Sequence, residues 1–328
     1  MKSGWTVRLR PTSPWRIGGA SGERDSTDLL YHSDTLYSAV TSAMGVLGER
    51  DAWLAATATN PQGPAVRFSS CFPFIGQTGL ITPPRTLWPP PPSAKVRWKG
   101  AKFVPLTLVR DLIAGTPLND DAWTLDGPSQ CLVQSGRLGP FRKIVRKSAA
   151  VDRLTGQTEP HSVAGLEFSP NSGLWCRVAF HDDEAAARWT EPVQSSFRWL
   201  ADSGFGGERS QGWGRAEKPY FSKPSHLHDE VPEAGDYWLL SLYVPGPEDR
   251  IDWSRGSYSV TTRSGRVESP VRAGQQKKSL PMIEEGSVLS AACPPEGSAP
   301  DVAPGGFPHP VFRFGFVFAI PLHEQVFA

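Results

Sequence analysis

The spacing of apolar residues near the start of the chain predicts a strand followed by a helix. Residues 1–10 alternate between apolar and polar side chains, which is typical of a half-buried β-strand. A second set of apolar residues recurs at helical spacing and comprises Leu36, Val40, Ala43, Met44 and Leu47. We predict a helix here, with Ser33 as its N-cap, Asp34 in its first turn and its end near Gly48.

Alternation returns in the middle of the chain and predicts a strand over residues 174–180. A helical region follows from Asp182, and Pro192 suits the first turn of a second helix within it. A glycine-rich loop over residues 204–215 comes next, and residues 213–221 have an extended pattern. The loop therefore follows a helix and precedes a strand.

The C-terminal part of the chain predicts strands. Residues 237–244 form an apolar run suited to a buried strand, and residues 285–289 lead into another. Alternate aromatic residues over 311–320 fit a central strand. Residues 219–234 are polar and contain prolines, so we place a domain boundary there.

A chain of 328 residues is long enough for two domains, each with its own core. We predict domains at residues 1–222 and 235–328. Strands and helices alternate with hairpins throughout, which indicates an α+β fold of the ferredoxin or RNA-recognition type.

The basic residues are clustered in particular segments of a chain that is nearly neutral as a whole. The formal net charge of +1 gives no overall signal for nucleic acid. Residues 126–168, however, are polar, basic and poor in core residues, which predicts an inserted β-hairpin arm. Its basic residues are Arg137, Arg142, Lys143, Arg146, Lys147 and Arg153. Such a cluster can bind phosphates or form an ordinary solvated face.

The glycine-rich loop is the most distinctive stretch, with five glycines and two arginines in residues 204–215. Glycine allows positive φ and close approach of the backbone, so we expect successive N–H groups to face an anion, with Arg209 and Arg215 adding charge. The loop lacks the Gly-Lys pair of a nucleotide-hydrolase loop, and a helix precedes it where a dinucleotide fingerprint needs a strand. The simplest ligand is a phosphate chain; the alternative is a surface loop or chain crossover.

The sequence has no clear signal for a metal site, a redox site or a membrane span. Its four cysteines are widely separated, without the paired spacing of a zinc site or a redox dithiol. We therefore expect a reduced cytoplasmic protein with no metal and no cofactor. No apolar run approaches the length that spans a bilayer, so we expect no membrane partner.

Three separated blocks resemble the RAMP superfamily of CRISPR proteins. They are residues 32–36, the glycine-rich loop 204–215, and residues 309–315. Residues 102–106, and Lys277-Lys278 followed by residues 285–288, resemble one subgroup. That subgroup contains the Csm-type subunits that cap the 5′ end of the guide RNA in type III-A effector complexes.

The resemblance implies two ferredoxin-like (RRM-like) modules, with a β-hairpin thumb at about residues 126–168. It implies binding of the repeat-derived 5′ tag of a CRISPR RNA (crRNA). It also implies contact with the large, polymerase-like subunit and with the adjacent backbone RAMP subunit. The RNA-binding residues expected from the resemblance and the basic clusters are His32, Ser33, Arg142, Lys143, Arg146, Lys147, Arg153, Gly204, Gly206, Gly207, Arg209, Ser210, Gly212, Gly214 and Arg215.

Two catalytic alternatives remain open. RAMP endoribonucleases deprotonate a ribose 2′-OH with a histidine and a lysine or tyrosine, and His32, Tyr31 and Tyr37 could supply that set. A target-cleaving backbone subunit would need an aspartate near the thumb, for which Asp25 and Asp28 are candidates. His32 could equally be packed beside the helix start, which is the role that we favour. We predict a subunit that binds RNA without cutting it.

Overall fold

The computed structural model describes residues 3–18, 25–90, 98–151, 156–223, 235–269 and 274–322. Its largest element is a seven-stranded antiparallel sheet in the order β11-β1-β10-β3-β4-β5, with β2 also paired to β10. These strands are β1 (Ser3–Leu9), β2 (Val66–Phe68), β3 (Phe72–Ile75), β4 (Thr78–Ile81), β5 (Val104–Pro105), β10 (Ser172–Phe180) and β11 (Tyr220–Ser222). The strands predicted at 1–10 and 174–180 are confirmed as β1 and β10, and they pair with each other.

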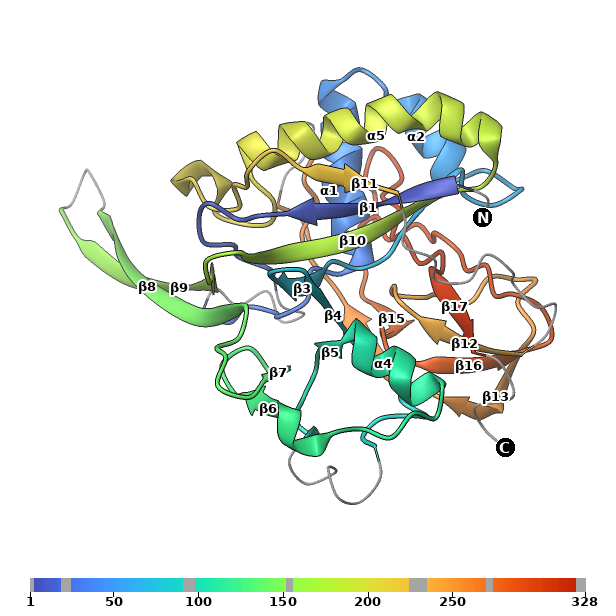
Figure 1. Ribbon diagram of the computed structural model, residues 1–328. Coiled ribbons are helices and arrows are strands. Elements are labelled where there is room, and N and C mark those ends of the chain that lie inside the picture. Colours follow the sequence, from blue (N-terminus) through green and yellow to red (C-terminus); the bar gives the residue numbers. More distant parts are fainter. Residues whose placement is uncertain are drawn as a thin grey trace.

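Helices α1 (Ser33–Val46), α2 (Arg50–Thr57) and α5 (Asp183–Ser203) lie together over one face of this sheet (Figure 1). The chain passes through β1, α1, β2 and β3, β10, α5 and β11 in that order, with α2 after α1 and further elements between β3 and β10. Val40, Phe68 and Phe197 are among the buried residues between the layers. Within the described ranges, none of the helices is long and apolar enough to cross a bilayer.

The helix predictions are partly confirmed. Helix α1 begins at Ser33 with His32 as its N-cap, so the assignment of Ser33 as the cap is wrong. The Ser33 hydroxyl instead accepts a hydrogen bond from the Leu242 N–H at 3.0 Å. Helix α1 is followed by Gly48, whose φ of +77° lies in the left-handed region, as predicted for its end.

The two helices predicted after residue 182 are one helix, α5, with Pro192 inside it. A proline in a helix interior removes one backbone hydrogen bond. The helix continues because Trp189, Val193, Phe197 and Leu200 form one buried face, and burying such side chains stabilises by about 1.5–3 kcal/mol each. The stabilisation from this buried face thus outweighs the cost of a proline inside the helix.

A long β-hairpin extends away from the large sheet (Figure 1). Strands β8 (Phe141–Val151) and β9 (Thr158–Phe168) pair from Phe141↔Phe168 to Val151↔Thr158. The insertion predicted from residue 126 therefore begins its hairpin only at 141. The preceding residues form a smaller unit made of α4 (Leu106–Ile113), η1 (Asp120–Ala122), β6 (Trp123–Asp126) and β7 (Cys131–Gln134).

The C-terminal part contains a four-stranded sheet in the order β13-β16-β12-β17 and a separate hairpin. Its strands are β12 (Gly235–Leu239), β13 (Ile251–Ser257), β14 (Val260–Arg263), β15 (Leu280–Ile283), β16 (Val288–Ala291) and β17 (Ala319–Leu322). Residues 235–269 and 274–322 include no helix. The expected helices of a second ferredoxin-like module are therefore missing from the described part of this half.

The central strand predicted over residues 311–320 is wrong. Of this segment only residues 319–320 belong to a strand, β17, which forms the edge of its sheet. The amides of Arg313 and Gly315 donate to the carbonyls of Pro300 and Ser298. Because Pro300 has no N–H, the two segments cannot form a regular two-way ladder there.

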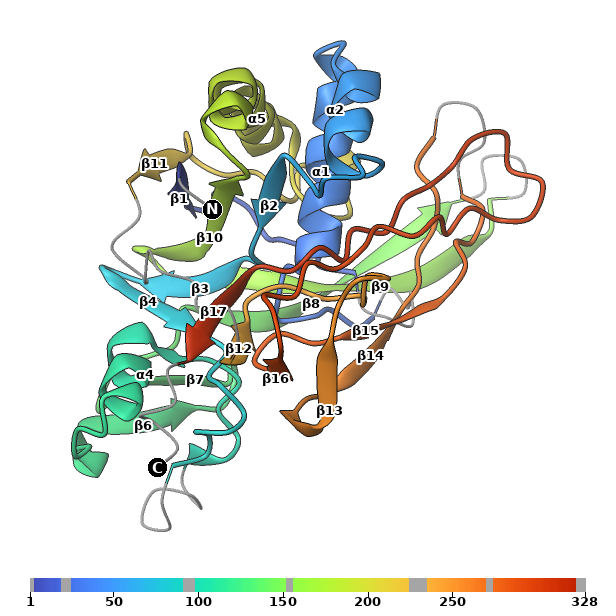
Figure 2. The ribbon, with the colours of Figure 1, turned by 90° about the vertical axis from the view of Figure 1, so that its right-hand side faces the viewer.

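The two halves of the molecule are joined by a buried ionic cluster at the start of α1. Asp34 is fully buried and accepts hydrogen bonds from Arg263 at 3.1 and 3.2 Å and from Arg313 at 2.6 Å. Burial opposes ionisation, but the two guanidinium groups outweigh it and hold the pKa of Asp34 well below its usual range. Beside this cluster, Tyr37 stacks on Phe314 with ring centroids 4.2 Å apart. The C-terminal chain passes close to α1 in the view of Figure 2.

Replacing Asp34 by asparagine should strongly destabilise the protein. The substitution leaves Arg263 and Arg313 buried without their carboxylate, and breaking such a buried pair typically costs about 3–5 kcal/mol. The free energy of unfolding, measured in urea, checks this. Asp51→Asn is the matched control because Asp51 also lies in the first turn of a helix but is exposed. Equal effects of the two substitutions would contradict the role assigned to Asp34.

Candidate nucleic-acid interface

The glycine-rich loop is folded tightly against the segment 13–17. Phe205 is buried and stacks on Trp15 with ring centroids 4.8 Å apart. Gly206 and Gly214 have φ of +74° and +84°, and a Cβ on either would collide with the carbonyl oxygen of Arg16 or of Phe205 respectively. These two positions require glycine for backbone packing.

Most loop amides that we expected to face a phosphate chain are used inside the protein. Gly207 N–H donates to the Arg16 carbonyl at 2.9 Å, and Gly214 N–H donates to the Pro14 carbonyl at 2.8 Å. The amides of Phe205 and Gly212 likewise donate to carbonyls within the loop, and Gly204 N–H ends helix α5. The prediction that successive loop amides face an anion is therefore wrong for these five amides.

The loop and the β8–β9 hairpin form one unit through Trp213. This indole is almost fully buried against Gly165 of β9, where a side chain would collide with the ring. The guanidinium of Arg146 on β8 lies 5.4 Å from the centroid of the Trp213 ring. At the hairpin root, Trp15 and Leu166 exchange backbone hydrogen bonds of 3.0 and 2.8 Å. The hairpin is thus fixed in position relative to the loop.

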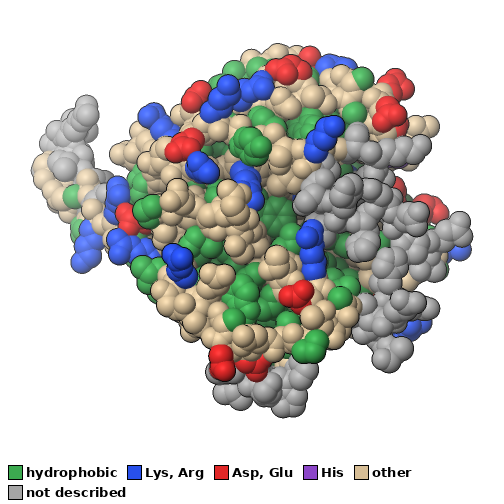
Figure 3. Space-filling view, in the orientation of Figure 1, with side chains coloured by type: hydrophobic (Ala, Val, Ile, Leu, Met, Phe, Trp, Pro, Cys, Tyr) green, Lys and Arg blue, Asp and Glu red, His purple; other side chains and the backbone are tan. Residues whose placement is uncertain are grey.

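Exposed basic side chains gather on this unit. Lys143, Arg146 and Lys147 are exposed on β8, and blue atoms mark the hairpin and its root in Figure 3. Arg142 is also exposed, but it is paired with Glu167 on the facing strand at 2.6 Å. Arg153 lies outside the described residues.

The loop contributes further polar side chains. Ser210 and Arg215 are exposed, and Arg215 has no ion-pair partner in the described part of the chain. Arg209 is partly buried and forms an ion pair with Glu268 of the C-terminal half. Arg209 and Arg215 therefore differ, because only Arg209 must leave a carboxylate to bind another anion.

Trp15, Gly165 and Trp213 were not among the predicted site residues. Trp213 stands inside the glycine-rich loop, and this position was the only available signal. Trp15 and Gly165 come close to the loop only through the fold, so neither could be identified from sequence spacing.

His32 and Ser33 lie inside the molecule rather than on this surface. His32 Nδ1 is 2.9 Å from Glu285 Oε1, and Nε2 is 3.0 Å from Asp28 Oδ2. Burial alone would lower the pKa of His32, but Glu285 and Asp28 raise it to about 9. Lys102 lies 3.4 Å from the same Asp28 carboxylate. This geometry favours the packing role for His32 over contact with RNA.

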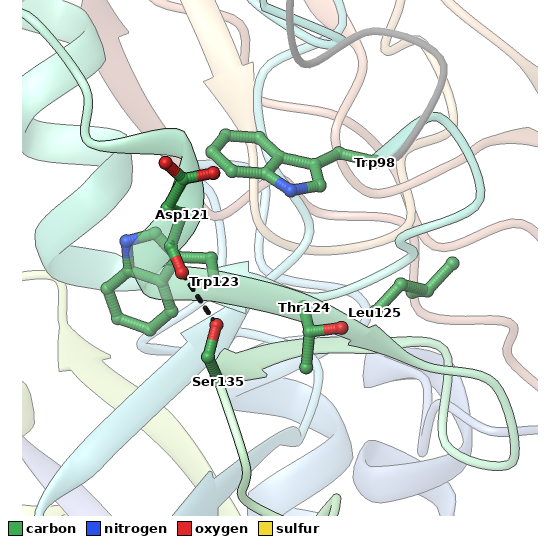
Figure 4. A pocket seen from close by; sticks show the side chains of 6 residues that line it. All are labelled: Trp98, Asp121, Trp123, Thr124, Leu125 and Ser135. Atoms are coloured by element: carbon green, nitrogen blue, oxygen red, sulfur yellow. Dashed lines mark hydrogen bonds between the residues drawn. The ribbon is translucent and has the colours of Figure 1, made fainter.

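A separate hollow lies in the small unit that precedes the hairpin (Figure 4). It is lined by Trp98, Asp121, Trp123, Thr124, Leu125 and Ser135. The Ser135 hydroxyl donates to the Asp121 carbonyl at 2.8 Å. The one charged residue in this lining is an acid, so the hollow does not suit a phosphate. Among the described residues, no group of three or more His, Cys, Asp or Glu side chains could hold a metal ion.

Comparison with known sequences finds a family model that matches the C-terminal part of the chain. The family model described as CRISPR Csm4 C-terminal domain matches residues 232–322. A relative from Streptococcus thermophilus, described as the CRISPR system Cms protein Csm4, is 25% identical over 317 residues. That alignment covers 90% of this chain and 91% of the relative.

Solved structures show the same fold. A chain from the crystal structure of a Csm3–Csm4 subcomplex of the type III-A CRISPR-Cas interference complex matches with a TM-score of 0.66 at 15% identity. The match covers 98% of this chain and 100% of that chain. A chain of a Csm1–Csm4 cassette in complex with cA4 matches with a TM-score of 0.59 at 16% identity, covering 98% of each.

The sequence resemblance and these findings agree. The antiparallel sheets and helices of this chain are consistent with the RAMP fold, and both the C-terminal match and the nearly full-length alignment are to Csm4 sequences. The C-terminal part of the chain thus matches the Csm4 C-terminal domain, and the chain as a whole is similar to a Csm4 protein.

Proposed function

We propose that this chain is an RNA-binding subunit of a type III-A CRISPR effector complex, where it holds the 5′ repeat-derived tag of the guide RNA without cutting it. The observation that carries the proposal is the basic hairpin held against the glycine-rich loop by Arg146 and Trp213. Lys143, Lys147 and Arg215 add exposed positive charge to the same unit. Clustered charge of this kind attracts a phosphate backbone irrespective of base sequence.

The comparisons support the assembly part of this proposal. Chains of similar fold occur in complexes with Csm1 and with Csm3. We infer that this chain likewise contacts the large subunit and an adjacent backbone RAMP subunit. Residues 1–222 and 235–328 would act as two modules, and the β8–β9 hairpin would be the thumb.

A metal-independent endoribonuclease is the alternative, and the geometry around His32 disfavours it. Both ring nitrogens face carboxylates, and a pKa near 9 keeps the ring protonated at neutral pH, so it cannot accept a proton there. Tyr31 and Tyr37 are buried, and burial raises the pKa of each phenol. Asp28 is paired with His32, which leaves Asp25 as the exposed candidate for a target-cleaving role.

The double substitution Lys143→Ala and Lys147→Ala should weaken RNA binding irrespective of the base sequence of the RNA. Removing one phosphate-neutralising lysine from a single-strand site lowers the slope of log K against log salt by about 0.7, so the pair should lower it by about 1.4. Titration of labelled guide RNA over a range of salt concentrations measures this slope. Arg110→Ala is the control because Arg110 is exposed on α4, away from the hairpin. An unchanged slope in the double variant would argue against phosphate contacts from β8.

The substitution His32→Gln should reduce stability in a pH-dependent way. The folded pKa of about 9 lies above the ordinary value of 6.5, so the stabilisation by His32 is complete below pH 6.5 and disappears as the pH rises through 9. The destabilisation on substitution should be about 3 kcal/mol at pH 6 and much smaller at pH 10. Urea unfolding of both proteins at the two pH values tests this. If the purified wild-type protein cleaved repeat RNA and His32→Gln abolished the cleavage, the non-catalytic assignment would be wrong.

A further inference from the structure

A second hollow lies between the helices and the C-terminal half. It has a volume of about 490 Å³, within the usual range for small-molecule sites. One wall is the exposed side of α1 and the start of α2, and the opposite wall consists of residues 266–269, Lys277 and residues 309–312. These two walls belong to parts of the chain that the buried Asp34 cluster joins. The hollow is separate from the surface formed by the hairpin and Trp213.

Lys277 is the unusual residue in this hollow. Its ammonium group is partly buried, yet it has no hydrogen-bond or ion-pair acceptor in the part of the chain that the structure describes. Burial and the nearby Arg313 lower the pKa of Lys277 to about 8, while Asp34 and Glu268 oppose that shift. A buried ammonium without an acceptor is costly, and an anionic ligand in the hollow would supply one.

The remaining lining suits a phosphate joined to a larger group. Arg266 and Arg50 add positive charge, and Arg266 donates to the Gly274 carbonyl at 2.8 Å. The acids of the lining are Asp51 and Glu268, and Glu268 is already paired with Arg209. Hydroxyl groups come from α1 at Ser38, Thr41 and Ser42, and apolar surface comes from Leu54, Val311 and Phe312. Charge, hydroxyl and aromatic groups therefore converge in a space of nucleotide size.

The histidine in the lining has a defined hydrogen-bond pattern. His309 Nδ1 lies 2.9 Å from the Pro310 carbonyl, which can only accept, so Nδ1 carries a proton. In the neutral ring Nε2 is then an acceptor for the Ser269 hydroxyl at 3.0 Å. Both ring nitrogens are thus occupied, and His309 shapes the wall rather than supplying a catalytic base.

The hollow adjoins the glycine-rich loop at Glu268. This residue lines the hollow and also lines the open surface formed by Gly206, Gly207, Arg209 and Ser210. An RNA chain that follows the loop would therefore arrive beside the hollow at the Arg209–Glu268 ion pair.

We propose that this hollow binds a single nucleotide unit, with its phosphate on Lys277 and its base against Phe312 and Leu54. The proposal deepens the RNA-binding function and rests on it where the nucleotide is part of the guide RNA. A free nucleoside monophosphate has the same chemistry and would occupy the same site.

Binding by the full-length protein tests the proposal. The probes are AMP, inorganic phosphate, and a short RNA oligonucleotide with the tag sequence. AMP should bind and raise the melting temperature, and phosphate should compete only weakly. Lys277→Met should weaken binding of AMP and of the RNA by at least about tenfold, the value of one good charge-assisted hydrogen bond. Lys278→Met is the matched control because Lys278 is exposed and does not line the hollow.

The outcomes separate the two proposals. If Lys277→Met binds AMP and RNA as tightly as the wild type, the hollow is not a nucleotide site, whereas the hairpin can still bind RNA. If AMP binding depends on Lys277 but the protein binds no RNA, the site stands as one for free nucleotides and the RNA-binding function fails. If phosphate binds as tightly as AMP, the assignment of a nucleotide is overturned. The variant's fold is checked by its melting temperature, which should not fall because an unpaired ammonium is removed.

Discussion

The buried ionic cluster at the start of α1 is the constraint on which the rest of the structure depends. Asp34 can remain ionised in the interior only because Arg263 and Arg313 approach it from the other half of the molecule. His32 and Glu285 form a second contact of the same kind across the same junction, and Ser70 donates to Glu285. Each half therefore carries charges that are stable only in the presence of the other half.

This junction explains the structural role of two distant sequence blocks, residues 32–36 and 309–315. The block 32–36 supplies His32, Ser33 and Asp34, and all three bind groups from the C-terminal half. The block 309–315 supplies Arg313 and also contains Phe314, which stacks on Tyr37. These two blocks hold the two halves together. The exposed basic residues of the candidate interface lie instead on the glycine-rich loop and the hairpin. A motif that looks functional in sequence can therefore be a joint between modules.

Elements determined by local pattern could be predicted from the sequence, and elements determined by distant contacts could not. Strand β1, helix α1 and the inserted hairpin follow from periodicity and from the run of polar, basic residues. Pro192 misled the prediction of α5 because the buried face of that helix stabilises it more than one missing hydrogen bond costs.

The same limit applies to the candidate site. The sequence identified the glycine-rich loop and its arginines, but the partners of the loop amides, Arg16 and Pro14, are nearly two hundred residues away. The five glycines suggested that the backbone of the loop is accessible to a ligand. At Gly206 and Gly214, however, the missing side chain makes room for a neighbouring stretch of backbone. Likewise, nothing in the spacing of Lys277 shows that its ammonium lies unpaired in a hollow.

The pairing of β8 with β9 alone has a consequence for how this protein can change over time. At its root the hairpin is held by Trp15 and Trp213, so residues there must satisfy the packing of the chain itself. Strand β8 has eleven residues, a length of about 36 Å, and among the described residues it pairs in the sheet with β9 alone. Exposed side chains there, such as Lys147, are therefore little constrained by the packing of the chain itself. Substitutions at the root of the hairpin are thus restricted by packing, whereas substitutions in its outer part are not.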